Sequence, residues 1–177
     1  MTAISLLVSL TGTRLRYERA GIAEGEFWRL FTGHFAHLGF SHMLLNIAGL
    51  ALVWLLVGSA WTLWQWAFIT LVSLAFIDVG FWFLDPNLSW YVGLSGLLHS
   101  MLVAGIIGRI REAPVESLAL GVIVLAKVAW EQFAGPLPGS ESSAGGAVVV
   151  NAHLYGAIAG IIAAGALRLR PAPRAPI

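Results

Sequence analysis

The chain has 177 residues, enough for one domain, and 58% of them are hydrophobic while only 11% are charged. That composition is too apolar for an ordinary soluble globule of this size, so we expect a membrane protein. The absence of cysteine excludes disulfides, thiolate catalysis and cysteine metal sites. Ten Lys and Arg against nine Asp and Glu give a net charge of +1 without a basic cluster, so nucleic acid is not an expected partner.

The apolar stretches, taken in chain order, predict an all-α bundle of six transmembrane helices. The first, Ile4 to Leu10, is about half a span and lacks the features of a secretory signal, so we interpret it as a short or truncated first helix. Five further stretches approach the ~20 residues that cross a bilayer as helix. They are Leu38 to Val57, Trp61 to Leu84, Val92 to Ile107, Val115 to Phe133 and Val148 to Leu167.

Residues between the spans indicate the ends of the bundle. The Gly, Pro and Ser stretch from Gly135 to Gly146 predicts a mobile surface loop. Tryptophans near span ends indicate interfacial anchors: Trp54, Trp61, Trp64, Trp66, Trp82 and Trp90. One side of the predicted topology carries Arg109, Arg111, Arg168, Arg170 and Arg174, which favours a cytoplasmic face with a tail at about residues 168–177. The opposite side carries Arg14, Arg16, Arg19 and Arg29, so the difference is small.

Polar side chains inside the predicted spans gather at one depth. Counted from the outer end of each span, eight of them fall within about ten residues, or roughly 15 Å of helix. They are His42, Asn46, Asp78, Ser95, His99, Lys127, Glu131 and His153. Such residues are costly in a membrane and mark functional interiors, so we expect a polar cavity that opens to the outer side and admits water.

Ser95 is the candidate nucleophile. The run Gly93-Leu94-Ser95-Gly96 opens a span directly after a polar loop, so the Ser95 amide lies among the unpaired donors of a helix N-terminus and can stabilise an oxyanion. The flanking glycines permit a sharp turn and close approach by a substrate. Read alone, the motif favours helix capping or small-residue packing over a nucleophile.

Two histidines are candidate bases for Ser95. His153 lies near the outer end of the last span, where Gly156 and Gly160 allow close approach to another helix. A serine and a histidine at matching depth in lipid need each other as partners. His99 is a rival, because a residue four positions after Ser95 lies on the same helical face. Spacing alone leaves both open.

The remaining polar residues have a functional and a structural interpretation. His42 and Asn46 lie four apart on one face and offer N–H donors for an oxyanion, or form an interhelical pair. Lys127 and Glu131, also four apart, can neutralise each other, and Asp78 can bond to a neighbouring helix. His34, His37 and His42 could suggest a metal, but no carboxylate completes an HExxH-like pattern, so we expect neither a metal nor a cofactor.

Taken together, these motifs resemble those of the rhomboid intramembrane serine proteases. Gly25 to Arg29 resembles the WR motif of their first loop, and His37, His42 and Asn46 resemble their HxxxxHxxxN helix. Gly93 to Gly96 resembles the GxSG site, and Ala152-His153 with Gly156 and Gly160 resembles the final AHxxGxxxG helix. The motifs occur in the same order over most of the chain, so the resemblance implies one rhomboid-like transmembrane domain over residues 1–177.

The resemblance also implies roles. Ser95 is expected to attack a peptide carbonyl and His153 to take and return the proton, in a dyad that no Asp completes. His42, Asn46 and the Ser95 amide are expected to hold the oxyanion, with Gly93 and His99 as supporting residues. Many rhomboids have an aromatic residue, often Tyr, four positions after the serine, where this chain has His99.

The short length and the run from Gly93 to His99 are similar to those of the rhombosortase subgroup. That similarity implies a bacterial inner-membrane enzyme with a site open to the periplasm, which removes GlyGly-CTERM anchors from exported proteins. Two other functions are weighed against this prediction. One is a rhomboid-like protein that binds transmembrane segments without cleaving them, and the other is a small transporter, which Lys127, Glu131 and Asp78 would favour.

Overall fold

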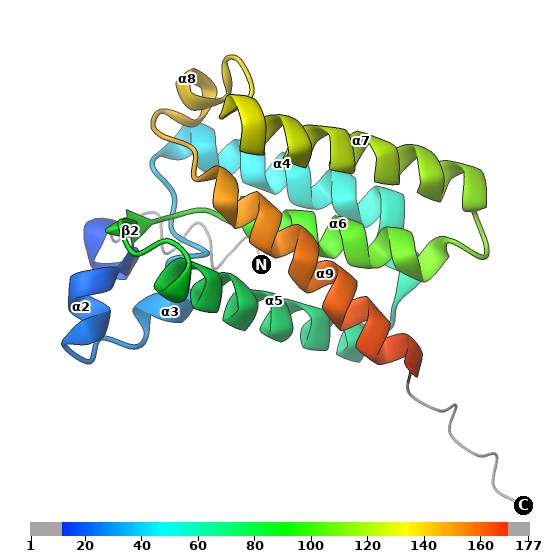
Figure 1. The fold of residues 1–177 in the computed structure, drawn as a ribbon, viewed down its shortest axis with the longest axis horizontal. Helices are drawn as coiled ribbons and strands as arrows, with labels where there is room; N and C mark the ends of the chain where they lie inside the picture. The colour runs from blue at the N-terminus through cyan, green and yellow to red at the C-terminus, as the bar shows by residue number, and fades with distance from the viewer. Residues whose placement is uncertain (1–11, 170–177) are drawn as a thin grey trace, which may run out of the picture.

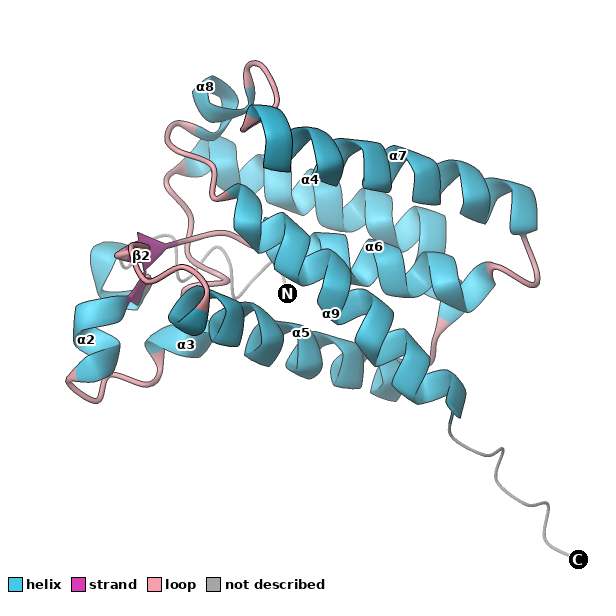
Figure 2. Ribbon diagram, in the orientation of Figure 1, coloured by secondary structure: helices cyan, strands magenta, loops and turns pink. Residues whose placement is uncertain are grey.

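The computed structural model describes residues 12–169, so the predicted run Ile4 to Leu10 and the end of the tail lie outside the described residues. Five long helices form the bundle (Figure 1): α4 (Phe40–Val57), α5 (Leu63–Phe83), α6 (Ser95–Arg109), α7 (Pro114–Ala134) and α9 (Val150–Leu169). Short elements precede and connect them: η1 (Gly12–Leu15), β1 (Tyr17–Glu18), α2 (Arg19–Ala23), α3 (Arg29–Thr32), η2 (Gly58–Ala60), β2 (Trp90–Tyr91) and α8 (Ser140–Ala144). The prediction of an all-α bundle is confirmed (Figure 2).

Helix α6 lies in the middle of the bundle and packs against α4, α5, α7 and α9. Four helices within residues 12–169 are long and apolar enough to cross a membrane, namely α4 extended through Ala60, α5, α7 and α9. Helix α6 has 15 residues, which is ~22 Å at 1.5 Å per residue, so the predicted span Val92 to Ile107 is shorter than a full crossing. Its neighbours, rather than its own length, set its place in the membrane.

The outer faces of the long helices are apolar. Leu55 of α4, Trp64 of α5 and Phe133 of α7 are 81%, 87% and 92% exposed. Helices that are hydrophobic on every side belong in the core of a large protein or in a membrane, and a chain of 177 residues is too small to cover five of them. The buried fraction of the spans is correspondingly low, at 22% for both α4 and α7. The chain is therefore an integral membrane protein.

Polar contacts hold the segment before α4 against the end of the bundle where α5 ends and α6 begins. Strands β1 and β2 pair antiparallel, with Tyr17 opposite Tyr91. The Arg19 guanidinium donates to the carbonyl oxygens of Phe81 at 2.5 Å and Asp85 at 2.9 Å, which lie at the C-terminal end of α5. It thus satisfies carbonyl groups that a helix end leaves unpaired. The β1–β2 pairing also explains why α6 begins at Ser95 instead of Val92.

The prediction of interfacial tryptophans needs correction at Trp66. Trp66 is only 4% exposed, and its indole N–H donates to the Gly58 carbonyl, so it is a buried helix-end contact instead of a lipid anchor. The Trp61 indole likewise donates to the Ala104 carbonyl of α6.

The stretch from Gly135 to Gly146 contains the short helix α8. Glycines with positive φ border that helix, Gly139 at 80° and Gly145 at 80°.

Candidate active site

Ser95 is the first residue of α6, and the turn before it is tightly constrained. Gly93 has φ of +130°, a conformation that residues with a side chain rarely adopt. Its amide donates to Gly33 O at 3.2 Å, and the Tyr91 hydroxyl donates to Gly93 O at 2.6 Å. Burial raises the pKa of Tyr91 above its ordinary value, so this hydroxyl stays protonated and remains a donor.

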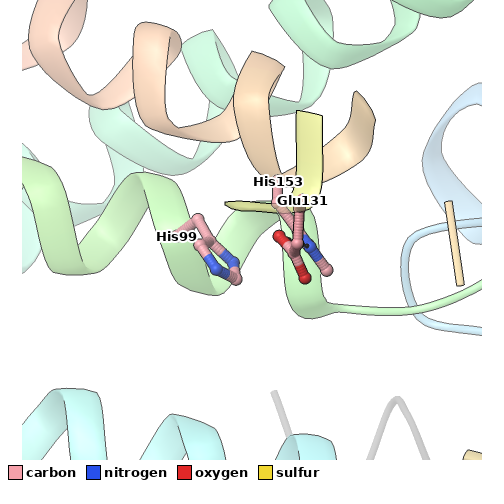
Figure 3. Close-up of side chains that lie close together, drawn as sticks. All are labelled: His99, Glu131 and His153. Carbon is pink, nitrogen blue, oxygen red and sulfur yellow. Dashed lines mark hydrogen bonds and ion pairs between the residues drawn. The ribbon is translucent and has the colours of Figure 1, made fainter. Parts of the chain in front are cut away.

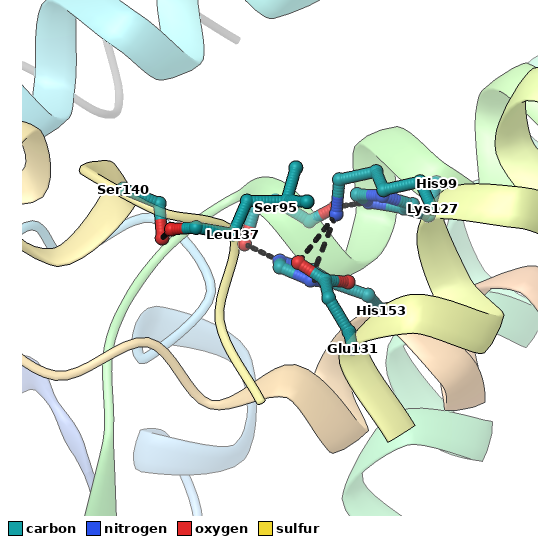
Figure 4. Close-up of polar contacts among 7 residues, drawn as sticks. All are labelled: Ser95, His99, Lys127, Glu131, Leu137, Ser140 and His153. Atoms are coloured by element: carbon teal, nitrogen blue, oxygen red, sulfur yellow. Dashed lines mark hydrogen bonds and ion pairs between the residues drawn. The ribbon is translucent and has the colours of Figure 1, made fainter. Parts of the chain in front are cut away.

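His153 lies in the first turn of α9, and its Nε2 is 3.0 Å from Ser95 Oγ (Figure 4). The two residues are 58 positions apart in sequence and meet because α6 and α9 pack closely. The contact face of α9 carries small residues, including Ala152, Gly156 and Gly160. The structure therefore brings together the candidate nucleophile and one of its two candidate bases at hydrogen-bond distance.

The other nitrogen of His153 faces two charged residues from α7. Its Nδ1 is 2.8 Å from Glu131 Oε2 and 3.2 Å from Lys127 Nζ. Lys127 also donates to Glu131 Oε1 at 2.7 Å, so the expected pairing of these residues occurs. The contact of both with His153 was not anticipated from the sequence. The only hint in the sequence was that Lys127, Glu131 and His153 all belong to the eight polar residues expected at one depth.

His99 lies beside His153 but faces a different atom of Ser95. The two imidazoles stack with centroids 4.3 Å apart and an interplanar angle of 21°. His99 Nδ1 donates to the Ser95 carbonyl oxygen at 2.7 Å, one turn earlier on α6. A nitrogen bound to the carbonyl in this way carries a proton and is not free to accept one from a hydroxyl.

The side chains close enough to bind a cation together are not the three histidines considered in the sequence analysis, His34, His37 and His42. Within residues 12–169, ligand atoms of His99, Glu131 and His153 lie within 4.8 Å of one another (Figure 3). Lys127 already supplies a positive charge to Glu131 at 2.7 Å. His34, from the set weighed earlier, pairs instead with Asp78 at 3.1 Å.

His42 and Asn46 lie on α4 and border the same cavity as Ser95. A β-carbon on Gly93 would lie 2.9 Å from His42 Cε1 and 3.1 Å from its Nε2, so the imidazole packs directly against the turn before Ser95. His42 Nδ1 accepts from the Leu38 amide at 3.3 Å, which leaves the proton of the neutral ring on Nε2. Asn46 uses one N–H on His42 O at 3.1 Å and keeps a second.

These residues surround a cavity of about 250 Å³. It includes seven of the eight residues expected in the polar layer: His42, Asn46, Ser95, His99, Lys127, Glu131 and His153. The eighth, Asp78, lies away from it, with His34. Leu137, Ser140 and Ala144 form another part of the wall, and Ser41 Oγ donates to Ser143 O at 2.5 Å, which ties α8 to the start of α4.

Tyr91, which lines the cavity, and Asp85, which binds the start of α9, were not singled out as site residues. Tyr91 was missed, although an aromatic residue just before the Gly93 motif was visible. Asp85 accepts hydrogen bonds from Asn151 at 2.7 Å and Tyr155 at 3.0 Å, and so anchors the start of α9 to the end of α5.

His37 packs edge to face on His42 with centroids 5.1 Å apart. Its burial, with a smaller effect of His42, lowers its pKa to about 4.

The fold and site together define a polytopic helical membrane protein with a serine and a histidine paired in a polar cavity between its spans. The family model of the Rhomboid domain matches residues 24–170 of this chain, from the segment before α3 to the end of α9. The chain therefore belongs to the rhomboid family of intramembrane proteases, whose members act on membrane-embedded substrates. No curated protein matches the sequence significantly.

Proposed function

We propose that this protein is an intramembrane serine endopeptidase in which Ser95 is the nucleophile and His153 the general base. The observation that carries the proposal is the 3.0 Å separation of His153 Nε2 and Ser95 Oγ. A nucleophile and base within ~2.6–3.2 Å are arranged for proton transfer. His99 acts as a support for the His153 ring, since its Nδ1 is engaged by the Ser95 carbonyl.

In the first half of the reaction, Ser95 Oγ attacks the carbonyl carbon of the scissile peptide bond while its proton passes to His153 Nε2. The resulting tetrahedral intermediate collapses as the C–N bond breaks. The imidazolium then gives its proton to the departing amine, and an ester of Ser95 remains. In the second half, a water molecule loses a proton to Nε2 and attacks the ester. The carboxylic acid leaves, and the proton returns to Ser95 Oγ.

The negative oxygen of each intermediate needs donors in a water-poor site. The Ser95 amide belongs to the first turn of α6, where no intrahelical acceptor exists. The free N–H of Asn46 and the Nε2–H of His42 belong to the facing helix α4 and border the same cavity. These three groups are proposed as the oxyanion hole, with Gly93 required for the approach of His42.

The proposed substrates are membrane-anchored proteins with a Gly-rich segment before their C-terminal anchor, as the similarity to rhombosortases implies. The cavity, at about 250 Å³, is smaller than the ~300–1,000 Å³ of ordinary ligand sites and favours small side chains. Glycine-rich segments unwind easily into the extended form that a protease binds. Both properties support removal of GlyGly-CTERM anchors.

The proposed orientation places the cavity on the periplasmic side of a bacterial inner membrane. Arg109 and Arg168 lie at the C-terminal ends of α6 and α9, opposite the Ser95 and His153 end. Orientation follows the count of Lys and Arg beside the spans, and five arginines (Arg109, Arg111, Arg168, Arg170 and Arg174) against four (Arg14, Arg16, Arg19 and Arg29) favour the Arg109 end for the cytoplasm.

Cleavage in bacterial membranes tests the proposal directly. A reporter with a Gly-rich tail followed by a hydrophobic span and basic residues should be cut by the wild-type protein and not by Ser95→Ala. Ser140→Ala is the matched control, because this serine also borders the cavity but its hydroxyl is bound to the Leu137 carbonyl. Wild-type cleavage rates in Ser95→Ala would rule the proposal out.

The second candidate is a rhomboid-like protein that binds transmembrane segments without turnover. Covalent labelling separates the two functions without knowledge of the substrate. A fluorophosphonate probe should label the wild-type protein and Ser140→Ala but not Ser95→Ala. A wild-type protein that never reacts with the probe would favour the non-catalytic function.

A further inference from the structure

The Nδ1 atom of His153 is contacted by groups of opposite charge. The Glu131 carboxylate is 2.8 Å away and can only accept a hydrogen bond, whereas the Lys127 ammonium is 3.2 Å away and can only donate one. Lys127 and Glu131 also bind each other at 2.7 Å (Figure 4). A neutral imidazole nitrogen satisfies only one of these neighbours, so the two compete for it.

The outcome of that competition decides which nitrogen carries the proton. If Nδ1–H donates to Glu131, Nε2 has a free lone pair that faces Ser95 Oγ and can accept its proton. If Nδ1 accepts from Lys127, the proton lies on Nε2, and the imidazole cannot act as a base toward Ser95. Which ring nitrogen is protonated is set by the hydrogen bond that the other nitrogen makes.

Burial shows that the carboxylate is held in this position. The Glu131 side chain is 2% exposed, whereas that of Lys127 is 29% exposed. A buried carboxylate without a charged partner is strongly unfavourable. The Lys127 ammonium on Oε1 provides that partner, and Oε2 remains for His153. The distances agree with this, because Nδ1 is closer to the accepting carboxylate of Glu131, at 2.8 Å, than to the ammonium of Lys127, at 3.2 Å.

We propose that Glu131 is a positioning residue that binds the Lys127 ammonium and Nδ1–H of His153 together, and so keeps the lysine from holding His153 in the inactive tautomer. The inference rests on the proposed function, because it assigns a role only if His153 is the base. It adds a third residue, and a lysine that opposes it, to the expected pair of Ser95 and His153. When the imidazole becomes charged during reaction, the same carboxylate also stabilises it.

This arrangement predicts an unusual pattern in a double-mutant cycle. In Glu131→Gln, Lys127 binds the amide oxygen, so the amide N–H₂ is turned to Nδ1 and both neighbours are donors. The wrong tautomer is then enforced, and we expect kcat to fall between ~10²-fold and ~10⁴-fold. The upper bound is the loss seen when the analogous Asp becomes Asn in a soluble serine protease. KM should stay within about 2-fold, since the substrate-binding groups are unchanged.

The second change should partly reverse the first. In Lys127→Met with Glu131→Gln, the amide is free to turn its oxygen to Nδ1–H, so kcat should recover at least ~10-fold over Glu131→Gln alone. Lys127→Met alone should lower kcat by only ~3- to 10-fold, because Glu131 keeps its contact with His153. Glu116→Gln, near the other end of α7, is the matched control for loss of a glutamate charge and should match wild type. A double variant as slow as or slower than Glu131→Gln would overturn the inference.

Direct observation of the ring separates this inference from the proposed function. In ¹⁵N-histidine-labelled protein in detergent, with His153 assigned by its loss in His153→Ala, the nitrogen chemical shifts report the tautomer without any need for cleavage. We expect Nδ1–H in wild type and Nε2–H in Glu131→Gln. The same tautomer in both proteins would refute the inference even if the enzyme cleaves. A protein that fails to cleave but shows the tautomer switch would refute only the protease function.

Discussion

Gly156 of α9 lies against the backbone of Gly96 of α6 so closely that a β-carbon at position 156 would be 2.0 Å from the Gly96 carbonyl oxygen. Gly96 is the residue after Ser95, and Gly156 lies one turn after His153. The closest approach of the two helices is therefore at the same level as the Ser95–His153 contact. A side chain at either glycine must move Ser95 away from His153.

We expect Gly156→Ala to abolish cleavage and destabilise the bundle. Overpacking of a tight interior costs ~1–3 kcal/mol, so the melting temperature in detergent should fall by at least ~3 °C. Gly165→Ala in the same helix is the control, because a β-carbon there meets nothing within 4 Å. Measurements of reporter cleavage and thermal unfolding should distinguish the two variants. Equal behaviour of both would contradict the packing argument.

Gly93→Ala should impair catalysis more than stability. The φ of +130° is strained for any residue with a side chain, at a cost of ~1–3 kcal/mol, and the new methyl group would press on His42. We expect kcat to fall at least ~10-fold as the oxyanion donors move. The control is Gly39→Ala, where the backbone is extended at φ 178° and the space is open. Unchanged kcat in Gly93→Ala would exclude this turn from the site.

Replacement of the two stacked histidines should have unequal effects. His153→Ala should abolish cleavage, because Nε2 of that ring faces Ser95 Oγ. His99→Ala should reduce kcat by ~2- to 10-fold, the range that loss of one aromatic stacking contact permits. His99→Phe retains a ring beside His153 and should recover part of that loss. The opposite order, with His99→Ala the more damaging, would transfer the base role to His99.

Asn46→Asp tests the oxyanion hole with almost no change of volume. The substitution replaces both N–H donors by acceptors, so stabilisation of the intermediate is lost together with the hydrogen bond to the His42 carbonyl. Loss of one such donor lowers kcat by ~10²–10³ with little change in KM. Steady-state cleavage in detergent or liposomes measures both parameters. A change confined to KM would instead make Asn46 a substrate-binding residue.

His37 predicts acid sensitivity at the start of α4. Its folded-state pKa of about 4 is below the ordinary 6.5, so the unfolded chain binds a proton in this window that the folded protein does not. The stability contributed by neutral His37 is complete above pH 6.5 and is lost as the pH falls toward 4. His37→Phe keeps the ring but cannot be protonated. Its melting temperature should fall less than that of wild type between about pH 7 and 4.5; an equal fall would refute the assignment.

The sequence predicted the spans well because hydrophobic length is a local property. The predicted stretch from Leu38 to Val57 became a helix from Phe40 to Val57, and that from Val148 to Leu167 a helix from Val150 to Leu169. Only the Val92 boundary moved noticeably, because pairing of β2 with β1 depends on a partner more than 70 residues away. The burial of Trp66 was missed because it depends on a contact outside its own helix, with the Gly58 carbonyl in the turn before α5.

By itself the sequence determined that this is a helical membrane protein and which polar residues share one depth, because span length and position within a span can be counted along the chain. Depth does not specify direction around a helix axis. Only the packing of α6, α7 and α9 decided that His153 instead of His99 reaches Ser95 Oγ, and that Glu131 and Lys127 meet at Nδ1 of His153. The contact of Asp78 with His34 follows instead from the packing of α5 against the segment that begins with α3. Those contacts depend on the relative rotation of neighbouring helices, which small residues such as Gly96 and Gly156 set in three dimensions.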